Sequence, residues 1–209
     1  MEIYQTEEQQ VEAIKSFWAQ NGNSIIAGLA LGFAGFIGFN YYQDHQLQKE
    51  LKIADTYLSN LESAEKNPQQ FVKASETFIK ENGDSSYVAL TAFSLAKNAA
   101  DKKDFAEAAK QLQTAISKAP NAAIKALANL RLAHVQTELK QFDDALATLA
   151  QPMPKSFIAS VEESKGDVYV LQDKKDLARN AYQAAIDADG SKSNPTLQMK
   201  IDDLAVALN

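Results

Sequence analysis

The stretch that decides the fold runs from residue 24 to residue 42 and reads SIIAGLALGFAGFIGFNYY. It lies within a longer segment, between Lys15 and Asp44, that contains no charged residue. About 18 uncharged and mostly apolar residues are enough to cross the hydrocarbon core of a bilayer as a helix. Trp18 precedes the stretch and two tyrosines end it, as interfacial anchors do. The sequence therefore predicts one membrane helix over residues 24–42, in contact with lipid. The alternative is a buried helix of a soluble core.

Glycine is concentrated in and beside this stretch. In water each glycine costs a helix about 1 kcal/mol relative to alanine. In lipid the backbone is forced to be helical, and small residues let two helices approach closely. Gly28 and Gly32 have the spacing of such helix-packing pairs. We expect them to contact another helix, of a second copy or of another membrane protein; the alternative is that glycine is simply common in membrane helices.

Residues 1–23 predict a short amphipathic helix, with Thr6 and Gln9 placed as a capping box. This front is acidic, whereas a secretory signal has a basic front and a cleavage site after its apolar run. We therefore interpret residues 24–42 as an uncleaved signal anchor. Lysines are slightly more numerous on the C-terminal flank, at Lys49 and Lys52, which by the positive-inside rule favours an internal large domain. Long domains, however, translocate largely regardless of charge.

The segment after the span predicts a long helix that continues from it without a flexible linker. Its apolar residues alternate by four and three, which is typical of one stripe along a helix. We expect this stripe to pack on the next helix, with a coiled-coil seam as the alternative. Asn67-Pro68 is expected to break the helix, and Asn82-Gly83 to end the second one. The stripe consists of Leu47, Leu51, Ala54, Leu58 and Leu61.

Paired helices recur over residues 84–190, in units close to the roughly 34 residues of a tetratricopeptide repeat. Three alanines, Ala108, Ala145 and Ala178, hold equivalent places in the second helix of each pair. Alanines and Gly166 at such places let two helices cross closely, and aromatic side chains such as Tyr182 fill the remaining gaps. An alanine-rich helical bundle without repeats is the alternative.

The predicted fold is all-α. A single N-terminal transmembrane helix is followed by a tetratricopeptide-like helical-repeat solenoid over residues 43–209. Asn194-Pro195 opens its last helix, whose apolar stripe includes Leu197, Ile201 and Leu204. A half-polar helix of this kind is the capping helix that an open repeat stack needs.

The composition argues against several kinds of chemistry. The chain has 209 residues, a net charge of −6, no cysteine and only two histidines. His45 and His134 are too far apart for a metal site of ordinary spacing, and phosphate-loop, dinucleotide and hydrolase motifs are absent. An acidic chain is also a poor partner for nucleic acid. We expect a protein that is not an enzyme and that uses no metal, no cofactor and no nucleic acid.

The first helices of a repeat stack build a concave groove. Helical spacing predicts that the groove is apolar at one end and acidic at the other, with a single basic member. Such a groove suits an extended or helical protein segment, unless the chain's own helices cover it. The inward residues are expected to be Leu90, Phe93, Lys97, Leu127, Leu130, His134, Glu163 and Asp167.

A set of short segments also carries a family resemblance. They are Met1-Glu2-Ile3-Tyr4, Gln10-Val11-Glu12-Ala13, Phe17, Asn21-Gly22, Leu127 to Gln136, Leu139-Lys140-Gln141, Lys165-Gly166-Asp167, Asp173-Lys174-Lys175, Ala178-Arg179, Tyr182 and Met199-Lys200-Ile201. Through these segments, over essentially its full length, the chain resembles the YfgM family of Gram-negative bacteria, the ancillary subunits of the SecYEG translocon.

The resemblance implies a single-pass type II protein of the inner membrane. Residues 1–23 would lie in the cytoplasm and residues 43–209 in the periplasm. This orientation is the opposite of the one that the positions of the lysines favour. It implies two partners, the SecYEG translocon and a membrane-anchored periplasmic chaperone of the prolyl-isomerase type. The implied role is to pass translocating polypeptides from the channel to periplasmic chaperones.

Two alternative functions remain open at this point. The spacing of Gly28 and Gly32 favours a self-associating membrane scaffold. The acidic N-terminal segment, together with the resemblance, allows a regulator that acts from the cytoplasm in a stress-response pathway.

Overall fold

The structure is a computed structural model that describes residues 7–83, 85–189 and 195–206. These residues form helices and turns, and they contain no strand. The all-α prediction is therefore confirmed. The chain divides into two compact units, residues 1–52 and residues 53–209, which are described separately below.

The first unit consists of the N-terminal part of helix α1, which spans Glu7–Lys66 in full. By length and composition this helix is apolar enough to cross a membrane. Its large apolar side chains are exposed, with Leu31 at 75%, Phe33 at 66% and Ile37 at 65%. A soluble core would bury such side chains, so their exposure fits a lipid-facing helix. The predicted capping box rests on Thr6, which lies outside the described residues.

The second unit begins with the last turns of α1 and with α2, Pro68–Glu81. Asn67 separates the two helices and caps α2, because its side chain accepts a hydrogen bond from the Gln70 backbone N–H. Proline at the first position of a helix loses no hydrogen bond, since that N–H has no partner within the helix. The predicted break at Asn67-Pro68 and the predicted helix end at Asn82-Gly83 are both confirmed.

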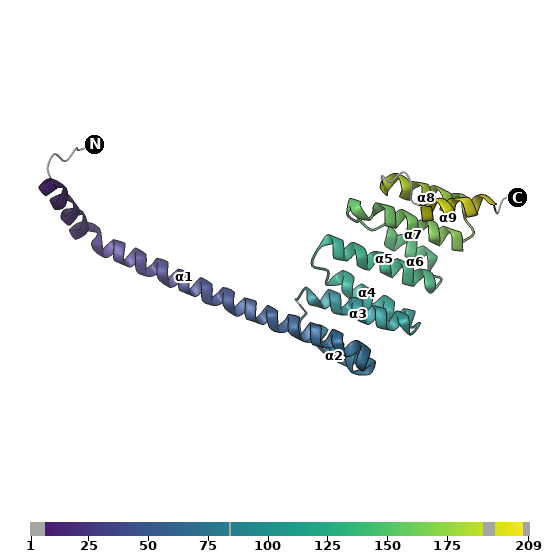
Figure 1. Cartoon of the computed structure of the whole chain (residues 1–209), viewed down its shortest axis with the longest axis horizontal. Helices are drawn as coiled ribbons and strands as arrows, with labels where there is room; N and C mark the ends of the chain where they lie inside the picture. Colours follow the sequence, from purple (N-terminus) through teal and green to yellow (C-terminus); the bar gives the residue numbers. More distant parts are fainter. Residues whose placement is uncertain (1–6, 84, 190–194, 207–209) are drawn as a thin grey trace. The chain divides into compact units, whose positions relative to one another are not determined.

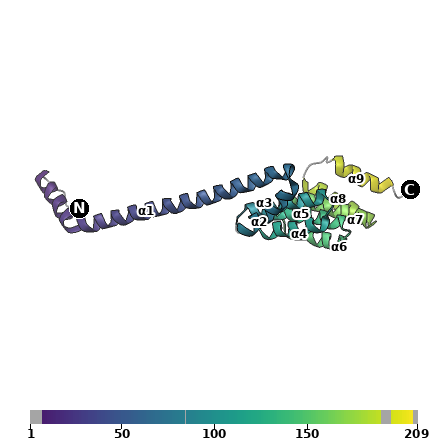
Figure 2. The same ribbon diagram turned by 90° about the horizontal axis from the view of Figure 1, so that it is seen from below.

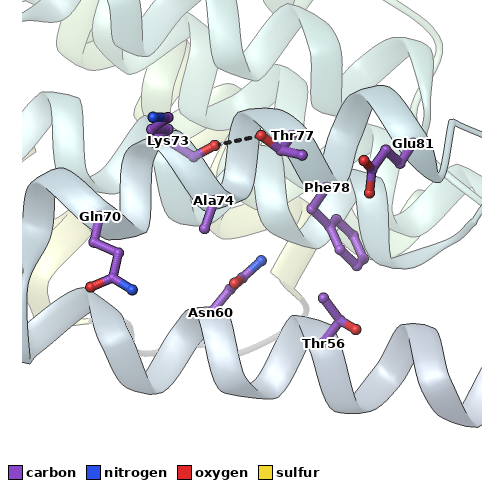
Figure 3. A pocket seen from close by; sticks show the side chains of 8 residues that line it. All are labelled: Thr56, Asn60, Gln70, Lys73, Ala74, Thr77, Phe78 and Glu81. Atoms are coloured by element: carbon purple, nitrogen blue, oxygen red, sulfur yellow. Dashed lines mark hydrogen bonds between the residues drawn. The ribbon is translucent and has the colours of Figure 1, made fainter.

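The prediction that the leucine stripe of α1 packs on the next helix is wrong. Within the second unit, Leu58 and Leu61 remain 53% and 41% exposed, and only Ala54 of the stripe is half-buried. The side of α1 that faces α2 carries polar residues instead, including Thr56 and Asn60 (Figure 3). The regular spacing correctly identified an apolar stripe, but it did not show which face of α1 lies against α2.

Six helices then form three antiparallel pairs, which stack in chain order (Figure 1). Figure 2 shows α3 and α5 along one side of the stack and α4 and α6 along the other. First helices contact first helices, α3 with α5 and α5 with α7, as they do in a tetratricopeptide solenoid. The bounds are α3 Tyr87–Asp101, α4 Phe105–Ser117, α5 Ala122–Glu138, α6 Phe142–Leu149, α7 Ile158–Leu171 and α8 Lys175–Asp189.

Small residues sit where the helices of each pair cross, as predicted. Ala108, Ala145 and Ala178 are fully buried. Gly166 of α7 lies directly against the ring of Tyr182 of α8, so that a Cβ there would overlap the ring. Close approach of two helix axes demands side chains of this size at the crossing point.

The turn inside each pair repeats the same backbone conformation. Lys103, Lys140 and Asp173 have φ values of 62°, 60° and 56°, which place them in the left-handed region. Each is the second residue after the first helix of its pair, where a left-handed residue ends a helix. The three turns are thus equivalent, which supports the division of the chain into repeats.

The last helix, α9 (Pro195–Val206), closes the stack by packing on α8. Leu197 and Leu204 are 2% and 7% exposed and join a core cluster with Tyr182 and Ala185. Gln198, Asp202 and Asp203 remain exposed, but Lys200, which the sequence places on the same polar face, is half-buried and pairs with carboxylates of α7. This division into a buried stripe and a polar face confirms the predicted capping helix.

Candidate functional site

The candidate site is the face formed by α3, α5 and α7, the first helices of the three pairs, where the sequence predicts a groove; it is called the groove face below. Leu90 and Leu127 are half-buried on this face and pack against the core beneath it. Phe93 and Leu130, also expected in the groove, are only 7% and 8% exposed and belong to core clusters. The apolar surface that a partner can touch is therefore smaller than the sequence pattern suggests.

Arg131 is a groove residue that the sequence reasoning missed. The carbon of its guanidinium lies over the Phe93 ring, 4.8 Å from the ring centroid. It follows Leu127 by four residues and precedes His134 by three, so helical spacing alone places it on this face. The expectation that Lys97 is the only basic residue of the groove is therefore corrected. Lys97 itself pairs with Asp101 of its own helix, at 3.2 Å.

His134 joins the second repeat to the third. Its Nε2 lies 3.0 Å from the Oγ of Ser164, thirty residues further along the chain. Ser164 is buried, and its hydroxyl also donates to the Ser160 carbonyl oxygen at 2.8 Å. Because the serine proton is used in that bond, the geometry fits an imidazole that donates from Nε2 to the serine oxygen. The His134 side chain thus links α5 to α7 at the edge of the groove face.

The acidic end of the groove is occupied by a cation from the capping helix. The Nζ of Lys200 lies 2.9 Å from Glu163 and 2.7 Å from Asp167. The hydroxyl of Tyr182 donates to Asp167 at 2.8 Å, and Lys200 also lies over the Tyr182 ring, 5.3 Å from its centroid. Lys200 thus brings Glu163 and Asp167 together and neutralises them from within the chain.

This cluster shifts two pKa values. Burial raises the pKa of Tyr182 well above its ordinary value of 10.0, and the hydrogen bond to Asp167 adds to the shift. Burial alone would lower the pKa of Lys200, but the hydrogen bonds to Asp167 and Glu163 outweigh it and raise the pKa above 10.5. Both groups therefore keep their protons at neutral pH, and the cluster is fully formed there.

A second concave feature lies between the end of α1 and α2. It is a cleft of about 360 Å³, with Thr56 and Asn60 on one wall and Gln70, Ala74 and Phe78 on the other (Figure 3). Its walls are mostly amides, hydroxyls and apolar groups, and Lys73 and Glu81 complete the lining. Within the described ranges, no group of three or more histidine and carboxylate side chains is arranged to hold a metal ion.

Comparison with known proteins gives one family and several full-length relatives. The family model described as a tetratricopeptide repeat-like domain matches residues 15–206. A relative from Escherichia coli (strain K12) is 34% identical over 207 residues, which cover 99% of this chain and all of the relative. Relatives from Haemophilus influenzae and Neisseria gonorrhoeae are each 30% identical, over 95% and 98% of this chain and 97% and 100% of their own lengths. All three are named ancillary SecYEG translocon subunit.

Proposed function

This chain belongs to the family of ancillary SecYEG translocon subunits, and we propose that it transfers newly translocated proteins from the channel to periplasmic chaperones. The apolar helix and these relatives mark it as an inner-membrane protein. The observation that carries the proposal is the similarity to proteins named as translocon subunits, which extends over essentially the whole chain. We also propose that it is not an enzyme and acts as an adaptor.

The proposed topology is type II. Residues 1–23 lie in the cytoplasm, residues 24–42 cross the membrane and residues 43–209 lie in the periplasm. Protease digestion tests this arrangement. The repeat domain should be digested in spheroplasts and protected in inverted vesicles, and the opposite pattern would reject the topology together with the periplasmic partners.

The proposed working surface is the groove face of α3, α5 and α7, and the proposed partners are translocating polypeptides and a membrane-anchored prolyl-isomerase-type chaperone. Half-buried Leu127, beside exposed Arg131 and His134, offers the mixed apolar and polar character that unfolded segments match. A solenoid presents such a surface without closing around its partner.

A photoreactive side chain at Leu127 tests this surface directly. With a translocating chain arrested in the channel, we expect crosslinks from Leu127 to that chain. Ala147 serves as the matched control, because it is exposed on α6, a second helix of a pair. Equal crosslinking from both positions, or crosslinking from Ala147 alone, would reject the groove as the working surface.

Self-association is a second candidate function, and one observation favours it. Gly28 and Gly32 lie one helical turn apart on α1, which is the small-residue spacing that lets two membrane helices approach closely. Replacing both glycines with isoleucine should abolish crosslinks between two copies in the membrane. Unchanged crosslinks would exclude this interface.

A further inference from the structure

Arg131 is exposed, it lies on the proposed working surface, and it forms no ion pair among the described residues. We infer that Arg131 is a carboxylate-binding residue, which selects partner segments that carry a carboxylate next to apolar side chains. This inference rests on the proposed function, because it assigns the chemistry of the segment that the groove takes.

The contact with Phe93 prepares Arg131 for this role. A guanidinium over an aromatic ring is attracted to the ring face, which restricts the side chain without using its N–H groups. None of the side-chain hydrogen bonds found in the described part of the chain has Arg131 as its donor. Its N–H groups are therefore not committed to a side-chain hydrogen bond within the described residues, and a guanidinium binds a carboxylate through two parallel N–H···O bonds.

Several carboxylates of α3 and α7 are already paired, whereas Arg131 has no ion-pair partner among the described residues. The carboxylates of Asp101, Glu162 and both acidic-end residues each have a lysine within ion-pair distance. Glu138 shares the face of α5 with Arg131 but lies seven residues further on, about 10 Å along the helix. An anionic group of a partner thus meets attraction at Arg131 and little opposing charge next to it.

The surroundings of Arg131 indicate which residues flank the carboxylate. Leu127 lies one helical turn before it, and Leu90 lies on the neighbouring helix with its side chain packed on the same core cluster. Both leucines keep part of their surface accessible. A segment with apolar residues beside an Asp, a Glu or a C-terminal carboxylate would cover these leucines and pair with the guanidinium at the same time.

Binding of three synthetic peptides to the full-length protein in detergent micelles tests the inference. The reference peptide contains Leu, Ala and Ser, has both ends blocked, and carries one central Gln. The second peptide replaces this Gln with Glu, and the third keeps the Gln but has a free C-terminal carboxylate. An uncharged dye reports binding by anisotropy. A charge-assisted pair should make the Glu peptide, the free-carboxylate peptide, or both bind about tenfold tighter than the reference.

The variants separate Arg131 from general charge effects. Arg131→Gln should remove the preference for a carboxylate, so that the three peptides bind the variant with equal affinity. Lys110→Gln is the matched control, because it removes an exposed lysine of α4, a second helix of a pair, that already pairs with Glu107, and the preference should persist. Arg131→Lys should retain only part of the preference, since an ammonium cannot form the bidentate pair.

Two failures have different meanings. If all three peptides bind the wild-type protein equally, or if Arg131→Gln retains the preference, the inference about Arg131 is overturned while the groove stays a peptide site. If no peptide binds, the groove itself is rejected as a working surface, and the inference falls with the proposed function.

Discussion

Replacing Gly166 with alanine should destabilise the third repeat. Gly166 lies on α7 where α8 crosses it, and a Cβ at this position would overlap Cδ1 and Cε1 of Tyr182 and lie 2.9 Å from its Cζ. The ring would have to move by about 1 Å to reach ordinary contact distance. It has little room to do so, because Tyr182 is 2% exposed and its hydroxyl is bonded to Asp167.

The size of the effect follows from three contributions. Overpacking a close helix crossing costs about 3 kcal/mol at the upper end of its usual range. Weakening the bond from Tyr182 to Asp167 adds about 1 kcal/mol. The better helix propensity of alanine offsets about 1 kcal/mol. We therefore expect a net loss of about 3 kcal/mol, which corresponds to a fall in melting temperature of roughly 6–12 °C.

Circular dichroism of the full-length protein in detergent measures this change, because the membrane helix stays folded while the repeats unfold. Gly35→Ala is the matched control, since a Cβ there meets no atom within 4 Å, and its melting temperature should equal that of the wild type. Adding Tyr182→Leu to Gly166→Ala should recover part of the loss relative to the sum of the single changes. A Gly166→Ala protein that melts at or above the wild-type temperature would refute the packing argument.

Three further predictions concern turns, a helix cap and alkaline pH. Lys103→Gly and Lys140→Gly should each stabilise the protein by about 0.5–1 kcal/mol, because glycine adopts the left-handed conformation without steric cost, and a lower melting temperature would contradict this. Asp104→Ala should lower the melting temperature by roughly 2–4 °C, because the Asp104 side chain accepts the Glu107 backbone N–H at 3.1 Å, and an unchanged temperature would show that this cap adds nothing. The unfolded chain loses the protons of Tyr182 and Lys200 at lower pH than the folded chain, so stability should fall above pH 10.0, by at most about 1.4 kcal/mol per pH unit for each group. Urea unfolding at pH 9 and pH 11 measures this fall in stability, which should be smaller in Tyr182→Phe. An equal stability at the two pH values would show that folding does not raise the pKa of either group.

The sequence predicted the parts of the fold that local chemistry determines. Asn67-Pro68 marks a helix boundary because proline removes a backbone donor, and the repeat alanines mark helix crossings because nothing larger fits. These signals act within a few residues or recur at a regular interval. They were sufficient for the order of the helices, the repeat pairs and the capping helix.

The rest depended on contacts between distant residues. The leucine stripe of α1 was assigned to the wrong face, because periodicity shows that a stripe exists and not what it contacts. Lys200 and Glu163 are far apart in the sequence, and no local sequence pattern predicts that they pair. Arg131 is a different case, since its spacing from Leu127 and His134 already indicates a place on the groove face.

The cap contact has a consequence for the order in which the protein is made. Helix α7 is synthesised before α9, so Glu163 and Asp167 exist for a time without the lysine that neutralises them. During that interval the third repeat presents two uncompensated negative charges, and the Tyr182 ring lacks the lysine above it. The groove therefore reaches its final charge only when α9 has docked. A chain stopped before α9 would differ from the finished protein in what its groove attracts, as well as in its stability.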